Sequence, residues 1–197
     1  DILSDQRRIQ ADLYWIEGDQ PVGRLMERVS VRASFMHIFD EVWRAVDLLN
    51  QKRAALRTSS AGEAPDFSRK AVAEVSVLLP TLMDFSVDKP IYIRLYDNRM
   101  EIGATGGPPS GAEYADLLSG ESPYRNKRLC AVMERLNANG CLNLNLTRSC
   151  AGVGSALQLL KLEYDLLHLR VTIPSANAGK PRKLRDDYPS NASLVLS

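Results

Sequence analysis

The strongest constraint on the fold lies in residues 91–102, where apolar and polar side chains alternate on both sides of a short polar turn. Alternation with a period of two is typical of a half-buried β-strand. We therefore predict two strands joined by a tight turn. The second strand leads into the glycine- and proline-rich stretch Gly103-Ala104-Thr105-Gly106-Gly107-Pro108-Pro109, which predicts a loop at the end of this hairpin.

The segment before the hairpin predicts one strand and then a helical part. Residues 9–16 are rich in β-formers and end in a polar turn, which is typical of a strand. Apolar residues recur at every third or fourth position from Val22 to Leu49. This spacing predicts helix over about residues 21–57, either as one helix or as two with a break near Ser34. A small, polar loop is expected over residues 58–66.

The remaining elements are predicted from caps and from apolar spacing. Ser68 is a suitable N-cap for a helix over residues 69–79, which Pro80 should end. The elements expected further along are a short helix over 112–118, a helix over 126–137, a strand or inserted loop over 141–146, a helix from 152 through Leu162, and a strand over 166–173.

Helices and strands are interleaved with hairpins and do not follow strict βαβ alternation. The simplest architecture is an α/β (α+β) two-layer sandwich, with helices packed on one face of a mixed β-sheet. We expect residues 1–174 to form this domain. Residues 175–197 are polar, and we expect them to form a flexible tail or an extended arm packed on a neighbour.

Charge and cysteine content narrow the classes of partner. The chain has 25 basic and 24 acidic residues, which gives no global argument for nucleic-acid or membrane binding and leaves a local basic patch open. The sequence shows no apolar run of transmembrane length, no CxxC pair and two distant histidines. We expect a cytoplasmic protein without a membrane partner or a zinc site. The chain begins at Asp1 without a methionine, which we interpret as a fragment of a longer protein.

Short motifs occur in an informative order: Glu74, Asp84-Phe85, the loop 103–109, Ser122-Pro123-Tyr124-Arg125-Asn126 and Gly152-Val153-Gly154. This order resembles the ATPase-type domain at the C-terminal end of many transcriptional regulators and RecG-helicase-related proteins. In that family, Glu-x-x-x-Asn and His-Arg-Asp-Tyr precede a strand ending in Asp-Asp-Arg-x-Glu-Ile, which leads to Asn-Pro-Gly-Gly-x-Pro and Pro-Arg-Asn. The resemblance covers roughly residues 9–173. It implies the Bergerat-type fold of the GHKL group, which includes gyrase, histidine-kinase and mismatch-repair ATPases.

The resemblance implies a role for each matching residue. Glu74 would be the catalytic acid that orients or activates water. The implied cofactor is ATP with Mg²⁺. The nucleotide-binding residues would be Thr105, Gly106, Gly107, Arg125, Asn126, Gly152 and Gly154.

Two positions depart from the family pattern. Leu78 stands where the family has the asparagine that holds Mg²⁺, and a leucine offers no lone pair to a hard cation. Ala104 stands where the family has the side chain that could reach the base. We therefore expect a degenerate domain that keeps the fold, has lost the chemistry and needs no cofactor, with ATP/Mg binding as the alternative.

The same residues also have ordinary structural interpretations. Glu74 can be a boundary residue with its carboxylate in water, and Gly106-Gly107 can be a plain loop. Arg125-Asn126 can be a helix N-cap with a neighbouring surface base. Arg99 and Glu101 are two apart on a strand, so they should point to the same face and pair there.

Three functions remain open. The first is a non-catalytic regulatory or scaffolding domain, for homodimerisation or effector sensing, of a transcriptional regulator whose DNA contact is made by a missing N-terminal domain of the AlbA or Schlafen type. The second is an ATP-binding enzyme with a rewired site, in which Thr105, Asp84 or Asn98 substitutes for a lost ligand. The third is a phosphotransfer protein that uses His37 on the first helix.

Overall fold

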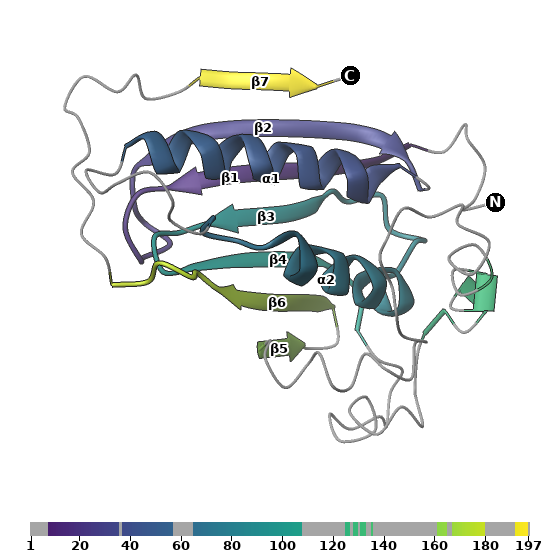
Figure 1. Ribbon diagram of the computed structural model, residues 1–197. Helices are drawn as coiled ribbons and strands as arrows, with labels where there is room; N and C mark the ends of the chain where they lie inside the picture. Colours follow the sequence, from purple (N-terminus) through teal and green to yellow (C-terminus); the bar gives the residue numbers. More distant parts are fainter. Residues whose placement is uncertain are drawn as a thin grey trace.

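The computed structural model describes residues 8–35, 37–56, 65–107, 125–126, 128–129, 131–132, 135, 161–164, 167–179 and 192–196. Within these residues, seven strands form one sheet in the order β5-β6-β4-β3-β1-β2-β7 (Figure 1). The elements are β1 (Arg8–Ile16), β2 (Leu25–Ser34), α1 (Ile38–Ala55), α2 (Arg69–Leu82), β3 (Ile91–Leu95), β4 (Arg99–Thr105), β5 (Lys161–Tyr164), β6 (His168–Pro174) and β7 (Ala192–Leu196).

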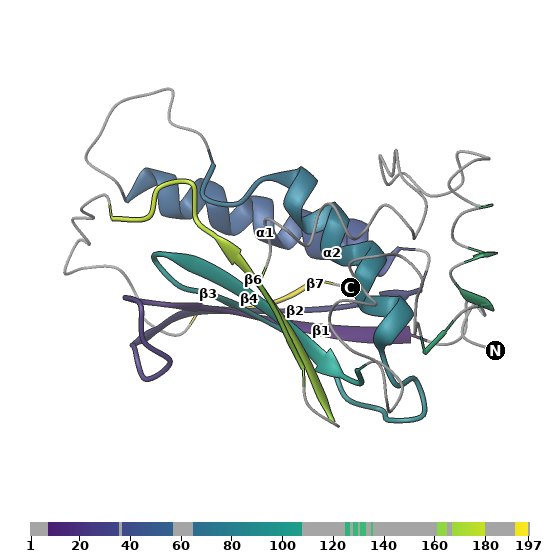
Figure 2. The same cartoon turned by 90° about the horizontal axis from the view of Figure 1, so that it is seen from below.

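The described elements make two layers. Both helices, α1 and α2, lie on the same face of the sheet, as the view in Figure 2 shows. The sheet is mixed, because β1 pairs in parallel with β3 and β2 in parallel with β7, while the other neighbours are antiparallel. The predicted two-layer α/β sandwich, with helices on one face of a mixed sheet, is confirmed.

The core lies between the helices and the sheet. One row of register partners crosses five strands and is almost wholly buried: Val29, Leu13, Ile93, Ile102 and Val171. The facing helices contribute the buried side chains Val42, Val46, Leu49, Val75 and Leu79. Because side chains alternate along a strand, the neighbouring residues of each strand point to the face that α1 and α2 do not cover.

The predicted helical part over residues 21–57 is wrong in its first half. Leu25–Ser34 forms strand β2, antiparallel to β1, and helix α1 starts only at Ile38. Residues 29–34 alternate strictly between small apolar and polar side chains, which is the pattern of a half-buried strand. Leu25, Val29 and Ala33 also fit a helical spacing of four, so this segment satisfies both periodicities.

The helix after Ser68 and the hairpin over residues 91–102 are present as predicted, but both continue further than expected. The helix that begins after Ser68 runs through Pro80 to Leu82, so Pro80 does not end it as expected. Strands β3 and β4 form the predicted hairpin. Strand β4 continues to Thr105, which places Gly103 and Ala104 in the sheet and corrects their assignment to a loop.

The C-terminal part differs from the expected elements in two places. Strand β6 confirms the strand expected over 166–173. The helix expected through Leu162 is wrong at its end, because Lys161–Tyr164 is strand β5. Within the expected tail, β7 pairs in parallel with β2 of the same chain. The described residues between 128 and 135 are helical as predicted, and the expectations for 112–118, 141–146 and 152–154 lie outside the described residues.

Candidate functional site

The candidate nucleotide residues that the structure describes gather where β4 and α2 end. Asp84 N donates to Thr105 O at 2.9 Å, and Met83 and Gly106 form an isolated antiparallel bridge. Gly106 N donates to Leu167 O, just before β6, at 3.0 Å. We call this region the capped edge, defined by residues 80–86, 105–107 and 125–126.

Backbone carbonyls at the end of α2 are bonded by residues from the candidate site. The last four C=O groups of a helix have no partner within the helix and need one elsewhere. The side-chain amide of Asn126 donates to Pro80 O and to Met83 O, both at 2.8 Å. Asn126 N donates to Thr81 O at 2.9 Å. Asn126 therefore caps the C-terminus of α2, a role that the sequence did not suggest.

Gly107 completes this cap. Its N–H donates to Leu82 O at 3.0 Å, so successive carbonyls from residue 80 to residue 83 all have partners. These bonds stabilise the last turn of α2, which extends past Pro80. The carbonyl groups of the last turn find donors in segments that lie far away in the sequence.

Gly106 is required by close contact and by its backbone conformation. Its φ is +139°, which L side chains rarely adopt, and a Cβ there would lie 2.4 Å from Leu82 O. The glycine that resembles part of a phosphate loop therefore has a structural reason for its identity. It lets the end of β4 lie directly against the end of α2.

An exposed ion pair lies beside this contact. Arg125 reaches Asp84 with an Nη1–Oδ2 distance of 3.2 Å, and its Nε donates to Gly107 O at 3.2 Å. The other carboxylate oxygen of Asp84 accepts hydrogen bonds from the hydroxyl and the N–H of Ser86 at 2.6 and 3.0 Å. The bonds from Ser86, with a smaller contribution from Arg125, hold the pKa of Asp84 below its ordinary value.

The other predicted site residues fall in different places. Ala104 is buried with its side chain against the core, next to Thr105 at the end of β4. Glu74 lies on α2, but its side chain is outside the described part, and so are Gly152 and Gly154.

Asn98 and His37 are separate from the capped edge. Asn98 precedes β4 and Thr105 ends it, so the strand holds them roughly 20 Å apart. Asn98 therefore does not lie beside Thr105. His37 lies just ahead of α1, and its Nδ1 is 2.9 Å from the Ser34 hydroxyl.

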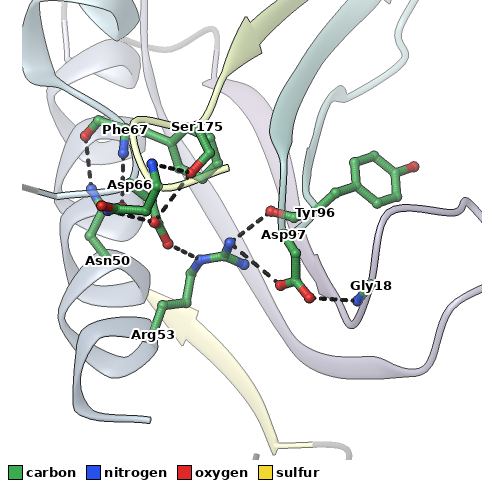
Figure 3. Close-up of polar contacts among 9 residues, drawn as sticks. Gly18, Asn50, Arg53, Asp66, Phe67, Tyr96, Asp97 and Ser175 are labelled. Atoms are coloured by element: carbon green, nitrogen blue, oxygen red, sulfur yellow. Dashed lines mark hydrogen bonds and ion pairs between the residues drawn. The ribbon is translucent and has the colours of Figure 1, made fainter. Parts of the chain in front are cut away.

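The opposite end of the sheet has a buried polar cluster that sequence reasoning missed. Figure 3 shows Arg53 of α1 donating from Nε to Asp66 at 2.7 Å and from Nη2 to Tyr96 O at 2.7 Å. Its Nη2 also lies 3.8 Å from Asp97, which accepts a hydrogen bond from Gly18 N at 3.0 Å. Arg53 is fully buried and Asp66 nearly so. A buried charge pair of this kind needs further hydrogen bonds to offset desolvation.

Those further bonds come from segments distant in sequence. Ser175 Oγ and Asn177 Nδ2 donate to Asp66 Oδ1 at 3.2 and 3.1 Å, and Asn50 bonds both backbone groups of Phe67. We call these residues the Arg53 cluster: Asn50, Arg53, Asp66, Asp97, Ser175 and Asn177. One signal was present in the sequence, because Asn50 and Arg53 continue the buried stripe of α1 at helical spacing.

In the described part of the chain, no three His, Cys, Asp or Glu residues are grouped closely enough to hold a metal ion. No helix among the described residues is long and apolar enough to span a membrane.

Comparisons with known proteins agree with an ATPase-like fold. Residues 88–163 match a family model described as "Putative ATP-dependent DNA helicase recG C-terminal", a match shorter than half of the chain. It supports an ATPase-like domain related to RecG. A search of curated proteins found no match.

A solved structure also resembles the chain. The crystal structure of the DIP2311 protein from Corynebacterium diphtheriae matches with a TM-score of 0.59 and 18% identity, over 87% of this chain and 34% of that chain. At this identity the likeness shows the fold alone. The chain spans about a third of that protein's length.

Proposed function

We propose that this chain is a non-catalytic regulatory or scaffolding domain of a cytoplasmic, DNA-binding transcriptional regulator, and that it serves homodimerisation or effector sensing through an ATPase-like fold. The observation that supports this most directly is the use of the candidate nucleotide residues as structural caps. Asn126 and Gly107 bond the carbonyl groups that end α2, and Gly106 is packed against the same turn.

The backbone donors of the glycine pair are already in use. A phosphate loop holds its ligand with backbone N–H groups that point toward the phosphate oxygens. Here the N–H groups of Gly106 and Gly107 donate to Leu167 O and Leu82 O, each at 3.0 Å. A phosphate would have to replace both of these bonds and separate β4 from α2.

The side chains at two key positions also fit Mg-nucleotide poorly. Leu78 offers no oxygen to Mg²⁺. The Ala104 side chain is a buried methyl group, which cannot hydrogen-bond an adenine edge. We therefore assign no reaction step to bound ATP.

The link to a DNA-binding regulator rests on the resemblance and on the match to the RecG C-terminal model. Related proteins commonly place an AlbA- or Schlafen-type DNA-binding domain ahead of this one. In that arrangement the N-terminal domain contacts DNA, and this chain supplies the contact between two copies or the response to an effector.

Thermal unfolding with and without millimolar Mg-ATP or Mg-ADP tests this proposal, together with sedimentation to measure the oligomeric state. A ligand at a hundred times its dissociation constant adds about 2.7 kcal/mol of stability, which corresponds to roughly 5–10 °C for a domain of this size. We expect no shift and a dimer. A shift of this size, with phosphate release that Glu74→Ala abolishes and the surface control Glu41→Ala preserves, would overturn the proposal in favour of an ATP-binding enzyme.

A further inference from the structure

The face of the sheet opposite α1 and α2 concentrates arginine and tyrosine side chains. One row of register partners on this face is Arg28, Tyr14, Arg94, Glu101 and Thr172. The next row is Ser30, Asp12, Tyr92, Gly103 and Arg170. We call these ten residues the outer face. In Figure 2 this is the side of the sheet that is turned away from α1 and α2.

The exposed charge of this face is mostly cationic. The Arg28 side chain is 45% exposed, whereas its partner Asp12 is 6% exposed. Likewise the Arg170 side chain is 42% exposed, above a Glu101 side chain that is 6% exposed. Asp12 and Glu101 therefore lie beneath guanidinium groups, whereas Glu163 of β5, the register partner of Arg170, is 35% exposed and accepts a hydrogen bond from Arg170 Nε at 2.9 Å. A solute that approaches this face encounters positive charge, although the whole chain is almost neutral.

Arg94 adds a cation without a carboxylate partner in the described part of the chain. Its guanidinium carbon lies 4.9 Å from the centre of the Tyr92 ring. In its row it stands directly beside Tyr14, and the guanidinium carbon of Arg28 lies 5.5 Å from the Tyr14 ring centre on the other side. Each tyrosine of this face is thus paired with an arginine.

The Tyr92 ring lies directly over Gly103, which has no side chain. A Cβ on Gly103 would lie 2.0 Å from Tyr92 Cζ, so the ring occupies the space that any other residue at 103 would fill. Burial also raises the pKa of the Tyr92 hydroxyl, so the ring is neutral at physiological pH.

We propose that the outer face binds single-stranded nucleic acid. Proteins that bind single strands combine a cationic surface, which follows the phosphates, with aromatic rings and guanidinium planes on which bases stack. Arg28 and Arg94 contact the phosphates here, and Tyr14 and Tyr92 stack with bases. An open sheet face suits a single strand, whose bases are free to turn toward the protein. This proposal does not depend on the proposed function, because it uses the other face of the sheet.

Fluorescence anisotropy with a labelled 20-nucleotide oligo-dT, in about 50 and 200 mM salt, tests the proposal. We expect saturable binding by the purified protein that weakens with salt. Arg94→Gln should lower the slope of log affinity against log salt by about 0.7, the value for one phosphate contact on a single strand. Tyr14→Leu, which keeps apolar bulk and removes the ring, should weaken binding at least about five-fold.

The matched control is Arg44→Gln. Arg44 is an exposed arginine on α1, in the other layer, where it pairs with Glu41. Its replacement removes the same charge and should leave binding unchanged. Thermal unfolding of each variant checks that it folds. If Tyr14→Leu does not fold, Arg94→Gln decides the test, because Arg94 has no ion pair to lose among the described residues.

Several outcomes would overturn the proposal. These are no binding at about 50 mM salt, an equal loss of binding in Arg44→Gln, and equal affinity for a duplex of the same length. Displacement of the oligonucleotide by poly-aspartate at the same charge concentration would also overturn it, because the face would then recognise acidic polymers in general.

Discussion

The two ends of the sheet handle charged groups in opposite ways. At the Arg53 cluster, a fully buried arginine and a nearly buried aspartate are surrounded by side-chain hydrogen bonds from distant segments. At the capped edge, the bonds that join the elements end mostly on backbone atoms, and the ion pair Arg125–Asp84 is about one-third exposed. At the Arg53 cluster, buried charges therefore hold distant segments together. At the capped edge, the charged side chains stay in contact with water, where a ligand or partner can reach them.

The largest expected effect is at the Arg53 cluster. Asp66→Ala leaves the Arg53 guanidinium buried without its main counter-charge, which should lower the free energy of unfolding by about 3–5 kcal/mol. Urea denaturation followed by circular dichroism measures this change. The matched variant at the capped edge, Asp84→Ala, removes an exposed pair and should cost about 1 kcal/mol or less. Equal costs for the two variants would break the comparison.

The next effect is a steric one at the capped edge. Gly106→Ala adds a Cβ that overlaps Leu82 O and forces alanine into a strained backbone conformation, with an expected loss of about 3 kcal/mol. The control is Gly18→Ala, where φ is +83° and no atom lies within 4 Å of the added Cβ. That substitution should cost about 1 kcal/mol. Thermal unfolding of both proteins separates crowding from backbone strain, and similar losses would contradict the tight contact at Gly106.

A smaller effect is expected from the cap on α2. Asn126→Ala removes the amide that bonds Pro80 O and Met83 O, and should cost about 1–3 kcal/mol because both carbonyls lose a donor. Asn126→Asp keeps the size and replaces the donor by an oxygen, so it should destabilise at least as much. Denaturant unfolding measures both variants. If Asn126→Asp were more stable than Asn126→Ala, the side chain would not be acting as a donor to the helix.

The smallest effect concerns pH. The pKa of Asp84 is lowered in the folded state, so its contribution to stability is present above the unfolded pKa and is lost as pH falls through the lower folded value. Asp84→Asn should therefore unfold with a weaker pH dependence than the parent at pH below about 4. Thermal unfolding between pH 2 and pH 6 tests this, with the exposed Asp88→Asn as the control for a simple change of charge. An unchanged acid limb in Asp84→Asn would show that the Ser86 and Arg125 contacts do not hold the carboxylate ionised.

Much of the fold was predictable because local sequence patterns determine many of its strands and helices. Residues 91–95 and 99–102 alternate with period two, and Ser68 does accept a hydrogen bond from Ala71 N as an N-cap. The pairing of Arg99 with Glu101 was also correct, at 2.7 Å. Strand β2 was missed because its apolar residues satisfy a helical spacing as well as a strand spacing. Its pairing with β1 and β7 selects the strand.

The candidate site was harder to predict because its residues act through partners remote in sequence. The motif order predicted that one site contains Thr105, Gly106, Gly107, Arg125 and Asn126, and in the structure these residues lie together at the capped edge. Their bonds to the end of α2 have no local signature, since a C-terminal helix cap from another segment leaves no fixed spacing. For the same reason nothing near Asp66 indicates that Ser175 and Asn177 will surround it.

The long sequence separations within the Arg53 cluster have a kinetic consequence. Asp66 and Asn177 are 111 positions apart, so a long loop must close before they meet. Contacts of this kind tend to form after the transition state for folding, where φ-values are close to zero. Asn177→Ala, which removes one of these long-range bonds, should therefore accelerate unfolding and leave the refolding rate nearly unchanged. The cluster would then govern the lifetime of the native protein and have little influence on how quickly a newly made chain reaches it.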